Sequence, residues 1–209
     1  MNKKYLHIVK HYESCLEKYG DTHKGVDWPN RKDALLRYQV MLESIREKET
    51  VHLLDFGCGT GHLLEYMQEQ EDFLSQIHYN GLDISEKYIE VAKQKFPDVD
   101  FYCLDVFEQG LTSVGTIDYA ILNGVFTEKR ALSFEEMWDY FQRLVTLVFS
   151  SVEKGMAFNV MSKAVDWERE DLFHLSTDLL IDFLTKKLSR NFIIRNDYGL
   201  YEYTVYLYK

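Results

Sequence analysis

The sequence Leu53-Leu-Asp-Phe-Gly-Cys-Gly-Thr-Gly-His-Leu-Leu64 contains an apolar run, three glycines at alternate positions and the start of a helical pattern. The apolar run over 51–54 predicts a short buried strand, and the spacing from Leu63 onward predicts a helix. Glycines between the two allow a sharp turn and let a ligand lie against the main chain. The helix that follows presents unpaired N–H groups and a positive dipole end. Together these features predict a binding site for a nucleotide-type ligand.

The spacing of the glycines distinguishes this loop from the common dinucleotide-binding loop. That loop has the pattern Gly-x-Gly-x-x-Gly. Here Gly57, Gly59 and Gly61 follow Asp55 in the pattern Asp-x-Gly-x-Gly-x-Gly. This pattern resembles the first motif of the class I S-adenosylmethionine-dependent methyltransferases.

Three further predicted strands end in polar side chains in the order that this family shows. The strand over 77–84 contains Asp83 near its end, about 20 residues beyond the glycine loop, where nucleotide-binding α/β units place a ribose-binding acid. A carboxylate suits this role because it accepts hydrogen bonds from two vicinal hydroxyls. Strands over 99–104 and 117–123 follow. The resemblance, which extends over about 51–162, implies that these residues bind S-adenosylmethionine: Asp55, Gly57, Gly59, Gly61, Asp83, Ile84, Asp105, Val106 and Asn123.

The resemblance also implies specific roles within that set. Asp105 would meet the adenine amino group, with Val106 beside the ring, and Asn123 would border the methionine part of the cofactor. Outside the matched region, Arg37 either pairs with the cofactor carboxylate, as an arginine does in similar enzymes, or is a surface charge on a helix.

The predicted fold is α/β: a Rossmann-like, seven-stranded, mostly parallel sheet with helices on both faces. Two final strands over 191–198 and 202–208 place the last strand antiparallel beside the fifth. We expect one methyltransferase domain over 1–209, with an N-terminal helical lid over 1–48 and a cofactor-binding core over 49–209.

Composition restricts the partners. The chain has 209 residues and a net charge of −10, which argues against nucleic acid or an anionic membrane as the main partner. Three widely spaced cysteines resemble neither a disulfide framework nor a zinc site. His7 and His11 lie four apart on a predicted helix but lack a third ligand, so we expect no metal.

Without an apolar leader after Met1 or a run of membrane-spanning length, we expect a cytoplasmic location. The oligomeric state is left open.

The resemblance implies methyl transfer to a small polar molecule through an oxygen or nitrogen atom. The segment over 123–126 lacks the prolines of enzymes that methylate DNA bases. An NAD-dependent oxidoreductase is an alternative that the glycine spacing and Asp105 disfavour. An aminopropyl transferase would need a motif that the sequence does not show, and a non-catalytic S-adenosylmethionine-binding module is a third alternative.

Few residues are expected to act in the chemistry itself, because methyl transfer depends chiefly on alignment and exclusion of water. A hydroxyl or amine acceptor also needs a base. His174, which follows the fifth strand, is the candidate, with a solvated histidine or Tyr198 as alternatives. Residues proposed for the lid and the acceptor pocket are Tyr12, Trp28 and Phe126. We expect the acceptor to bind between the lid and the segment over 162–174.

Overall fold

The computed structural model describes residues 3–70 and 77–209. Its helices are α1 (Leu6–Tyr19), α2 (Arg31–Leu42), α3 (His62–Gln68), α5 (Glu86–Lys95), α6 (Val106–Gln109), α7 (Phe134–Ser151) and α8 (Thr177–Lys187). Its strands are β1 (Val51–Phe56), β2 (Ile77–Asp83), β3 (Phe101–Cys103), β4 (Tyr119–Leu122), β5 (Gly155–Ser162), β6 (His174–Leu175), β7 (Phe192–Arg195) and β8 (Glu202–Tyr208).

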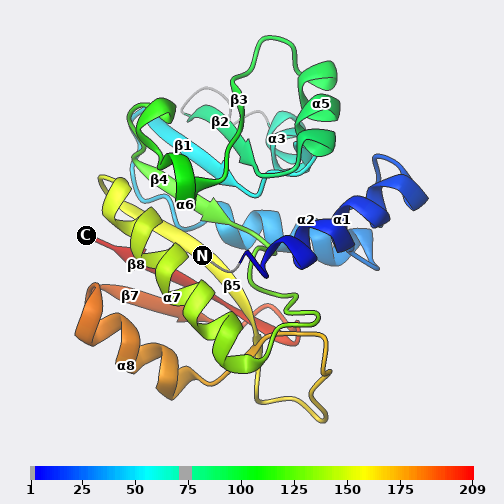
Figure 1. Ribbon diagram of the computed structural model, residues 1–209. Helices are drawn as coiled ribbons and strands as arrows, with labels where there is room; N and C mark the ends of the chain where they lie inside the picture. The colour runs from blue at the N-terminus through cyan, green and yellow to red at the C-terminus, as the bar shows by residue number, and fades with distance from the viewer. Residues whose placement is uncertain (1–2, 71–76) are drawn as a thin grey trace.

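The strands form a single mixed sheet in the order β3-β2-β1-β4-β5-β8-β7 (Figure 1). Strands β1 to β5 run parallel, and β8 is antiparallel to both of its neighbours, β5 and β7. This confirms the predicted parallel sheet with its last strand antiparallel beside the fifth. The two-residue strand β6 pairs with the end of β5 and makes an eighth strand that the sequence did not predict.

The sheet is buried on both faces, and β1 shows this directly. Leu54 and Phe56 belong to the core cluster that also contains residues of α7 and α8. Val51 and Leu53 point to the opposite face and pack with residues of α2 and α3. Alternate side chains of a strand lie on opposite faces, so an apolar strand buried on both sides is what a parallel sheet covered by two helical layers requires.

The strand order places a ligand crevice beside β1. From β1 the chain moves outward through β2 to β3, and it then returns to β4 on the other side of β1. Ligands of open α/β sheets bind at such a reversal, beyond the carboxyl ends of the strands. The glycine loop, residues 57–61, leaves β1 at this point.

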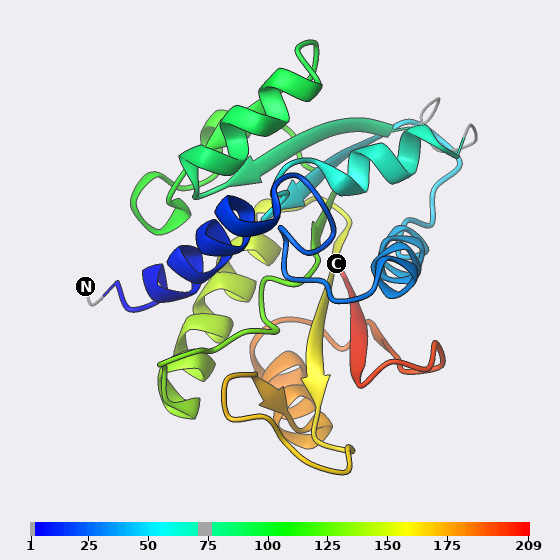
Figure 2. The same ribbon diagram turned by 90° about the vertical axis from the view of Figure 1, so that its right-hand side faces the viewer.

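The N-terminal region predicted as a lid consists of two parts with different positions (Figure 2). Helix α1 ends at Gly20 and lies across the edge of the sheet where the crevice opens. Helix α2 begins after Asn30, whose side chain accepts a hydrogen bond from Lys32 N. Because its side chains Ala34, Met41 and others are buried in the core with β1, α2 belongs to the helical layer. We call α1 and residues 20–30 the lid.

A local sequence signal sets the start of α7. The Ser133 side chain accepts a hydrogen bond from Glu136 N, and the Glu136 carboxylate accepts one from Ser133 N, which completes a capping box. The apolar stripe of this helix, which includes Met137, Phe141 and Leu144, is buried against the sheet. Within the described ranges, no helix combines the length and the apolarity needed to cross a membrane.

Candidate active site

A cavity lies at the carboxyl ends of the parallel strands, beneath the lid. Most of the residues predicted from the sequence line it: Tyr12, Trp28, Asp55, Gly57, Gly59, Asp83, Ile84, Asp105, Val106 and Asn123. They come from α1, from residues 20–30 and from the ends of β1, β2, β3 and β4. The structure therefore brings the predicted strand-end residues together at one site.

The glycine loop passes close to neighbouring segments. Gly57 N and Cys58 N both donate to Leu82 O, at 2.7 and 3.0 Å, which ties the loop to β2. Gly57 has φ +75°, and a Cβ on it would lie 2.7 Å from Val125 Cγ2, so only glycine fits there. Gly61 does not line the cavity. It precedes α3 with φ +85° and lies against Phe96, where a Cβ would come within 2.9 Å, so its role here is packing.

Asp83 is held by main-chain donors on both oxygens. Its Oδ2 accepts from Gly59 N at 3.0 Å and its Oδ1 accepts from Ser85 N at 2.9 Å. Burial raises the pKa of this carboxyl, and the main-chain hydrogen bonds oppose that shift. Because a carboxylate has about four acceptor positions, Asp83 retains capacity for hydroxyl donors in the cavity.

Asp55 is buried at the end of β1 and faces Tyr79, a residue of β2 that sequence reasoning did not select. The Tyr79 hydroxyl donates to Asp55 Oδ2 at 2.7 Å. Burial raises the pKa of Asp55 to about 7, the Tyr79 hydrogen bond opposes this, and the charge of Asp83 adds to it. The two acids at the centre of the site are thus electrostatically coupled.

Asp105 is the N-cap of α6 and also binds Tyr5, the residue that precedes the lid helix α1. Its Oδ1 accepts from Phe107 N at 3.2 Å, and its Oδ2 accepts from the Tyr5 hydroxyl at 2.7 Å. Tyr5 stacks on Tyr140 with ring centroids 5.4 Å apart, which closes this end of the cavity with aromatic surface. Burial chiefly raises the pKa of Tyr5 well above its usual range.

Sequence reasoning missed Tyr5, although a signal for it exists. The residues Tyr5, Ile8, Val9 and Tyr12 all line the cavity. Their spacing is that of one apolar face of a helix. The helical periodicity of these four residues is the signal that could have identified this apolar face as the one that covers the site.

The lid is fastened to the protein by tyrosine hydroxyls. Tyr12 OH donates to Gly124 O at 3.1 Å, and Tyr88 OH donates to Tyr12 O at 2.8 Å and to Gly25 O at 2.7 Å. Trp28 packs on the loop after β4, and a Cβ at Gly124 would come within 2.8 Å of its ring. The lid is thus held to α5 through its main chain and to the loop after β4 through the side chains of Tyr12 and Trp28.

Arg37 does not line the cavity but lies directly behind it. Its guanidinium stacks on the Trp28 ring at 4.1 Å and forms a bidentate ion pair with the buried Glu202, with Nη2 to Oε2 at 2.7 Å. Glu202 Oε1 also accepts from Asn159 Nδ2, and Asn159 Oδ1 accepts from Gly124 N at 2.7 Å. Arg37 Nη1 is buried without a hydrogen-bond partner among residues 3–70 and 77–209. The arginine is therefore not a surface charge.

His174 does not reach the cavity, and we replace its expected role as a base with a structural one. It is buried, its Nδ1 donates to Ser162 O at 2.6 Å, and its Nε2 accepts from Arg169 N at 3.2 Å. Both ring nitrogens of the neutral side chain are thus occupied in closing the loop between β5 and β6. No residue of the segment over 162–174 lines the cavity, so this segment does not form the expected acceptor pocket with the lid.

Phe126 was expected at the substrate and is instead part of the core. It is fully buried, and its ring meets the rings of Phe141 and Phe158 with centroids 4.7 and 6.0 Å away. Its neighbour Val125 lines the cavity in its place. The predicted position in the loop after β4 was therefore wrong by one residue.

Comparisons with known proteins identify similarity to methyltransferases. The profile of the methyltransferase domain family matches residues 54–148. A putative methyltransferase of Mycobacterium tuberculosis, Rv1506c, is 25% identical over 160 residues, which cover 74% of this chain and 91% of that protein. The ubiquinone/menaquinone biosynthesis C-methyltransferase UbiE of Campylobacter jejuni is 31% identical over 137 residues, covering 63% of this chain and 57% of UbiE.

Solved structures show the same fold. Magnesium protoporphyrin IX methyltransferase (ChlM) from Synechocystis PCC 6803, crystallised with S-adenosylmethionine, superposes with a TM-score of 0.64 at 17% identity and covers 100% of this chain and 98% of its own. The plantazolicin methyltransferase BpumL in complex with S-adenosylhomocysteine has a TM-score of 0.59 at 16% identity and coverages of 100% and 99%. Residues 54–148 thus match a methyltransferase domain, the whole chain has the fold of S-adenosylmethionine-dependent methyltransferases, and S-adenosylmethionine is the cofactor that these comparisons support.

Proposed function

We propose that the cavity binds S-adenosylmethionine in one orientation and presents its methyl group to a small molecule. The observation that carries this proposal is the position of Asp83, at the end of β2 beside the glycine loop. In this orientation Asp83 accepts from the ribose hydroxyls, and Ile84 and Val106 contact the adenine. Asp105 accepts from the adenine amino group, and Asn123 borders the methionine part.

The glycine loop fits the amino-acid part of the cofactor. Gly57 and Gly59 let that part lie against the main chain, and His62 and Tyr38 also line the cavity. Arg37 lies behind Trp28 and its guanidinium is paired with the buried Glu202, so we assign it a supporting role behind the cavity wall and not direct contact with the cofactor carboxylate.

The cofactor supplies an electrophilic methyl group on a good leaving group, and the chain supplies alignment and a dry site. Holding reactants in line can contribute about 7–11 kcal/mol to lowering the barrier. Tyr12 and Trp28 close the cavity above the loop after β4, and closure of this kind excludes water from the reacting atoms.

We propose an acceptor that combines a polar reacting atom with an apolar or ring portion. The part of the cavity nearest the loop after β4 is lined by Tyr12, Val26, Trp28 and Val125, which offer ring and aliphatic surface. The names of three similar proteins, UbiE, ChlM and BpumL, refer to quinones, a porphyrin and plantazolicin. The net charge of −10 supports a small molecule over nucleic acid. Three free cysteines support a reducing, cytoplasmic location.

Binding calorimetry tests the cofactor proposal. We expect S-adenosylhomocysteine to bind the wild-type protein and NAD not to bind. The variant Asp98→Asn, at an exposed acid outside the site, should bind like the wild type. Tight binding of NAD without a response to S-adenosylhomocysteine would contradict the proposal.

A screen for methylated products tests the acceptor proposal. Incubation with S-adenosylmethionine and fractionated metabolites should yield a product heavier by one methylene group. Trp28→Ala should lower turnover at least tenfold, whereas Trp167→Ala, at a side chain 74% exposed, should leave it unchanged. Methylation of DNA or tRNA with no activity on small molecules would overturn the proposed substrate class.

A further inference from the structure

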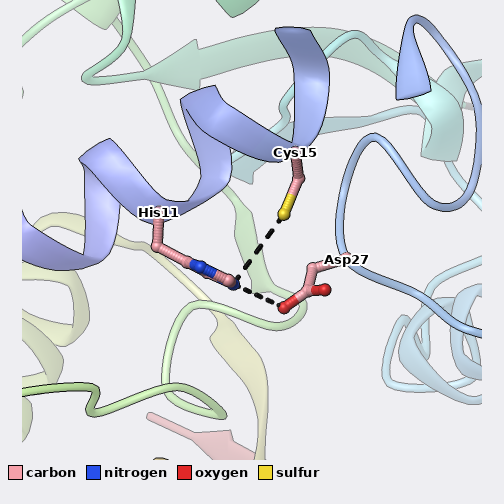
Figure 3. Close-up of side chains that lie close together, drawn as sticks. All are labelled: His11, Cys15 and Asp27. Atoms are coloured by element: carbon pink, nitrogen blue, oxygen red, sulfur yellow. Dashed lines mark hydrogen bonds and ion pairs between the residues drawn. The ribbon is translucent and has the colours of Figure 1, made fainter. Parts of the chain in front are cut away.

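Residues 3–70 and 77–209 contain one group of side chains with three potential metal ligands of different chemistry: His11, Cys15 and Asp27. His11 Nε2 lies 2.7 Å from Asp27 Oδ2 and 3.8 Å from Cys15 Sγ, and the three ligand atoms all lie within 4.8 Å of one another. Figure 3 shows the imidazole and the thiol extending from α1 toward the carboxylate. The sequence had offered only His7 as a partner for His11, and the structure provides two others.

The backbone holds the three side chains in position. His11 and Cys15 are four residues apart on α1, so they project from the same face of the helix. Asp27 comes from the loop before α2 and has φ +59°, one of two positive φ values at non-glycine residues in the described chain. Such a conformation costs free energy and persists where the surrounding structure maintains it. Here the positive φ belongs to Asp27, the residue whose carboxylate is hydrogen-bonded to His11.

We propose that His11, Cys15 and Asp27 bind a divalent transition-metal ion such as Zn²⁺. Imidazole nitrogen, thiolate sulfur and carboxylate oxygen are the ligands that zinc takes in proteins. In a tetrahedral site with bonds of about 2.0–2.3 Å, the ligand atoms are about 3.3–3.6 Å apart. The observed separations of His11 Nε2 from Asp27 Oδ2 (2.7 Å) and from Cys15 Sγ (3.8 Å) lie on either side of this range. Small rotations of the side chains would therefore bring the three ligand atoms to tetrahedral positions. Three protein ligands leave the fourth position to water.

Charges around the thiol determine how the ion would bind. Burial, together with the carboxylates of Asp27 and Glu128, raises the pKa of Cys15, while Arg130 lowers it. Arg130 is itself paired with Glu128 and Asp171, each at 3.2 Å, so its positive charge is largely balanced. A cysteine binds a metal ion as the thiolate, so binding at Cys15 should be accompanied by release of the thiol proton.

The position of the site connects it to the lid. Tyr12, next to His11, lines the cavity, and so do Val26 and Trp28 on either side of Asp27. A metal ion bound here would join α1 to residues 20–30, the two segments of the lid. The metal site does not rest on the proposed cofactor orientation, because none of its three ligands lines the cavity.

Titration of the full-length protein with Co²⁺, followed by absorption spectroscopy, tests the proposal without cofactor or substrate. We expect one equivalent to bind with a thiolate-to-metal charge-transfer band, and Zn²⁺ to displace it. Calorimetry of Zn²⁺ binding in buffers of different ionisation enthalpy should report release of a proton. Cys15→Ser should abolish the band, and His11→Gln and Asp27→Asn should each weaken binding at least tenfold.

Matched variants keep the test interpretable. Cys103→Ser removes an exposed free cysteine and His7→Gln removes the neighbouring histidine, so both should retain the band and the wild-type affinity. Circular dichroism and the thermal midpoint would show whether each variant is folded. A Cys15→Ser variant that is folded and binds Co²⁺ as the wild type does, or a wild type without a charge-transfer band, would overturn the proposal.

Discussion

The two halves of the active site are built in different ways. The cofactor half consists of the glycine loop and the ends of β2 and β3, which follow one another along the chain and present Asp55, Asp83 and Asp105. The lid half, which comprises the lid and the α2 residues that support it, is assembled from segments far apart in sequence. Tyr12 bonds to Gly124, and Arg37 pairs with Glu202, 165 residues away. The first half is a repeated local unit, whereas the second depends on long-range packing.

This difference predicts how each half responds to substitution. A residue of the cofactor half contributes mainly to ligand binding, because it lies at a strand end that lines the cavity. A residue of the lid half that belongs to the buried network from α2 to the loop after β4 contributes to stability as well. Four substitutions separate these effects.

Glu202→Ala should have the largest effect, on stability. Removal of the carboxylate leaves the Arg37 guanidinium buried and uncompensated, and breaking such a pair costs about 3–5 kcal/mol. Denaturant unfolding followed by fluorescence measures this loss. Asp182→Ala, which breaks the exposed pair with Lys186, should cost less than about 1 kcal/mol. Equal losses in the two variants would show that the buried network does not hold the lid half.

Asp83→Asn should chiefly weaken cofactor binding. The change removes the charge that strengthens hydrogen bonds from the ribose, each worth about 1.5–3 kcal/mol, so affinity for S-adenosylhomocysteine should fall about 10- to 100-fold. Asp83→Ala should also lower stability, because Gly59 N and Ser85 N lose their acceptor. Calorimetry that finds unchanged affinity in the asparagine variant would assign Asp83 to the loop alone.

Asp55 should give the stability a specific pH dependence. Its pKa is about 7 in the folded protein, against an ordinary aspartate value of 3.8. Between about pH 4 and pH 7, Asp55 is therefore protonated in the folded protein and ionised in the unfolded chain. The free energy of unfolding therefore falls as the pH rises through this window. Between pH 5 and pH 7 the loss due to Asp55 is about 2 kcal/mol. Asp55→Asn should flatten the profile by that amount, and parallel profiles would contradict the raised pKa.

His174→Ala should have the smallest effect. Loss of hydrogen bonds to Ser162 O and from Arg169 N should lower stability by about 1 kcal/mol. Turnover with a saturating acceptor should stay within about threefold of the wild type, because a base normally contributes 10²–10⁴-fold. A loss of two orders of magnitude in a folded variant would restore His174 as a catalytic base.

The fold and the cofactor half could be predicted from the sequence because they depend on local patterns. Alternation of apolar residues specifies strands buried on both faces, and glycine positions such as Gly57 specify backbone that no other residue adopts. Once the strands are parallel, their carboxyl ends meet at one edge. The acids at or just after the ends of β1, β2 and β3 must then lie together, so the proximity of Asp55, Asp83 and Asp105 could be predicted from the sequence.

Only the tertiary structure decided the functions of side chains that meet partners far along the chain. His174 follows a strand that ends near the site, yet its ring nitrogens are occupied by neighbours in its own loop. Phe126 and Val125 differ by one position, and packing against Phe141 determines which of them is core. His11 gained Asp27 as a partner because the loop after α1 folds back on the helix. Sequence spacing fixes neighbours within an element, whereas contacts between elements follow from the packing of the whole chain.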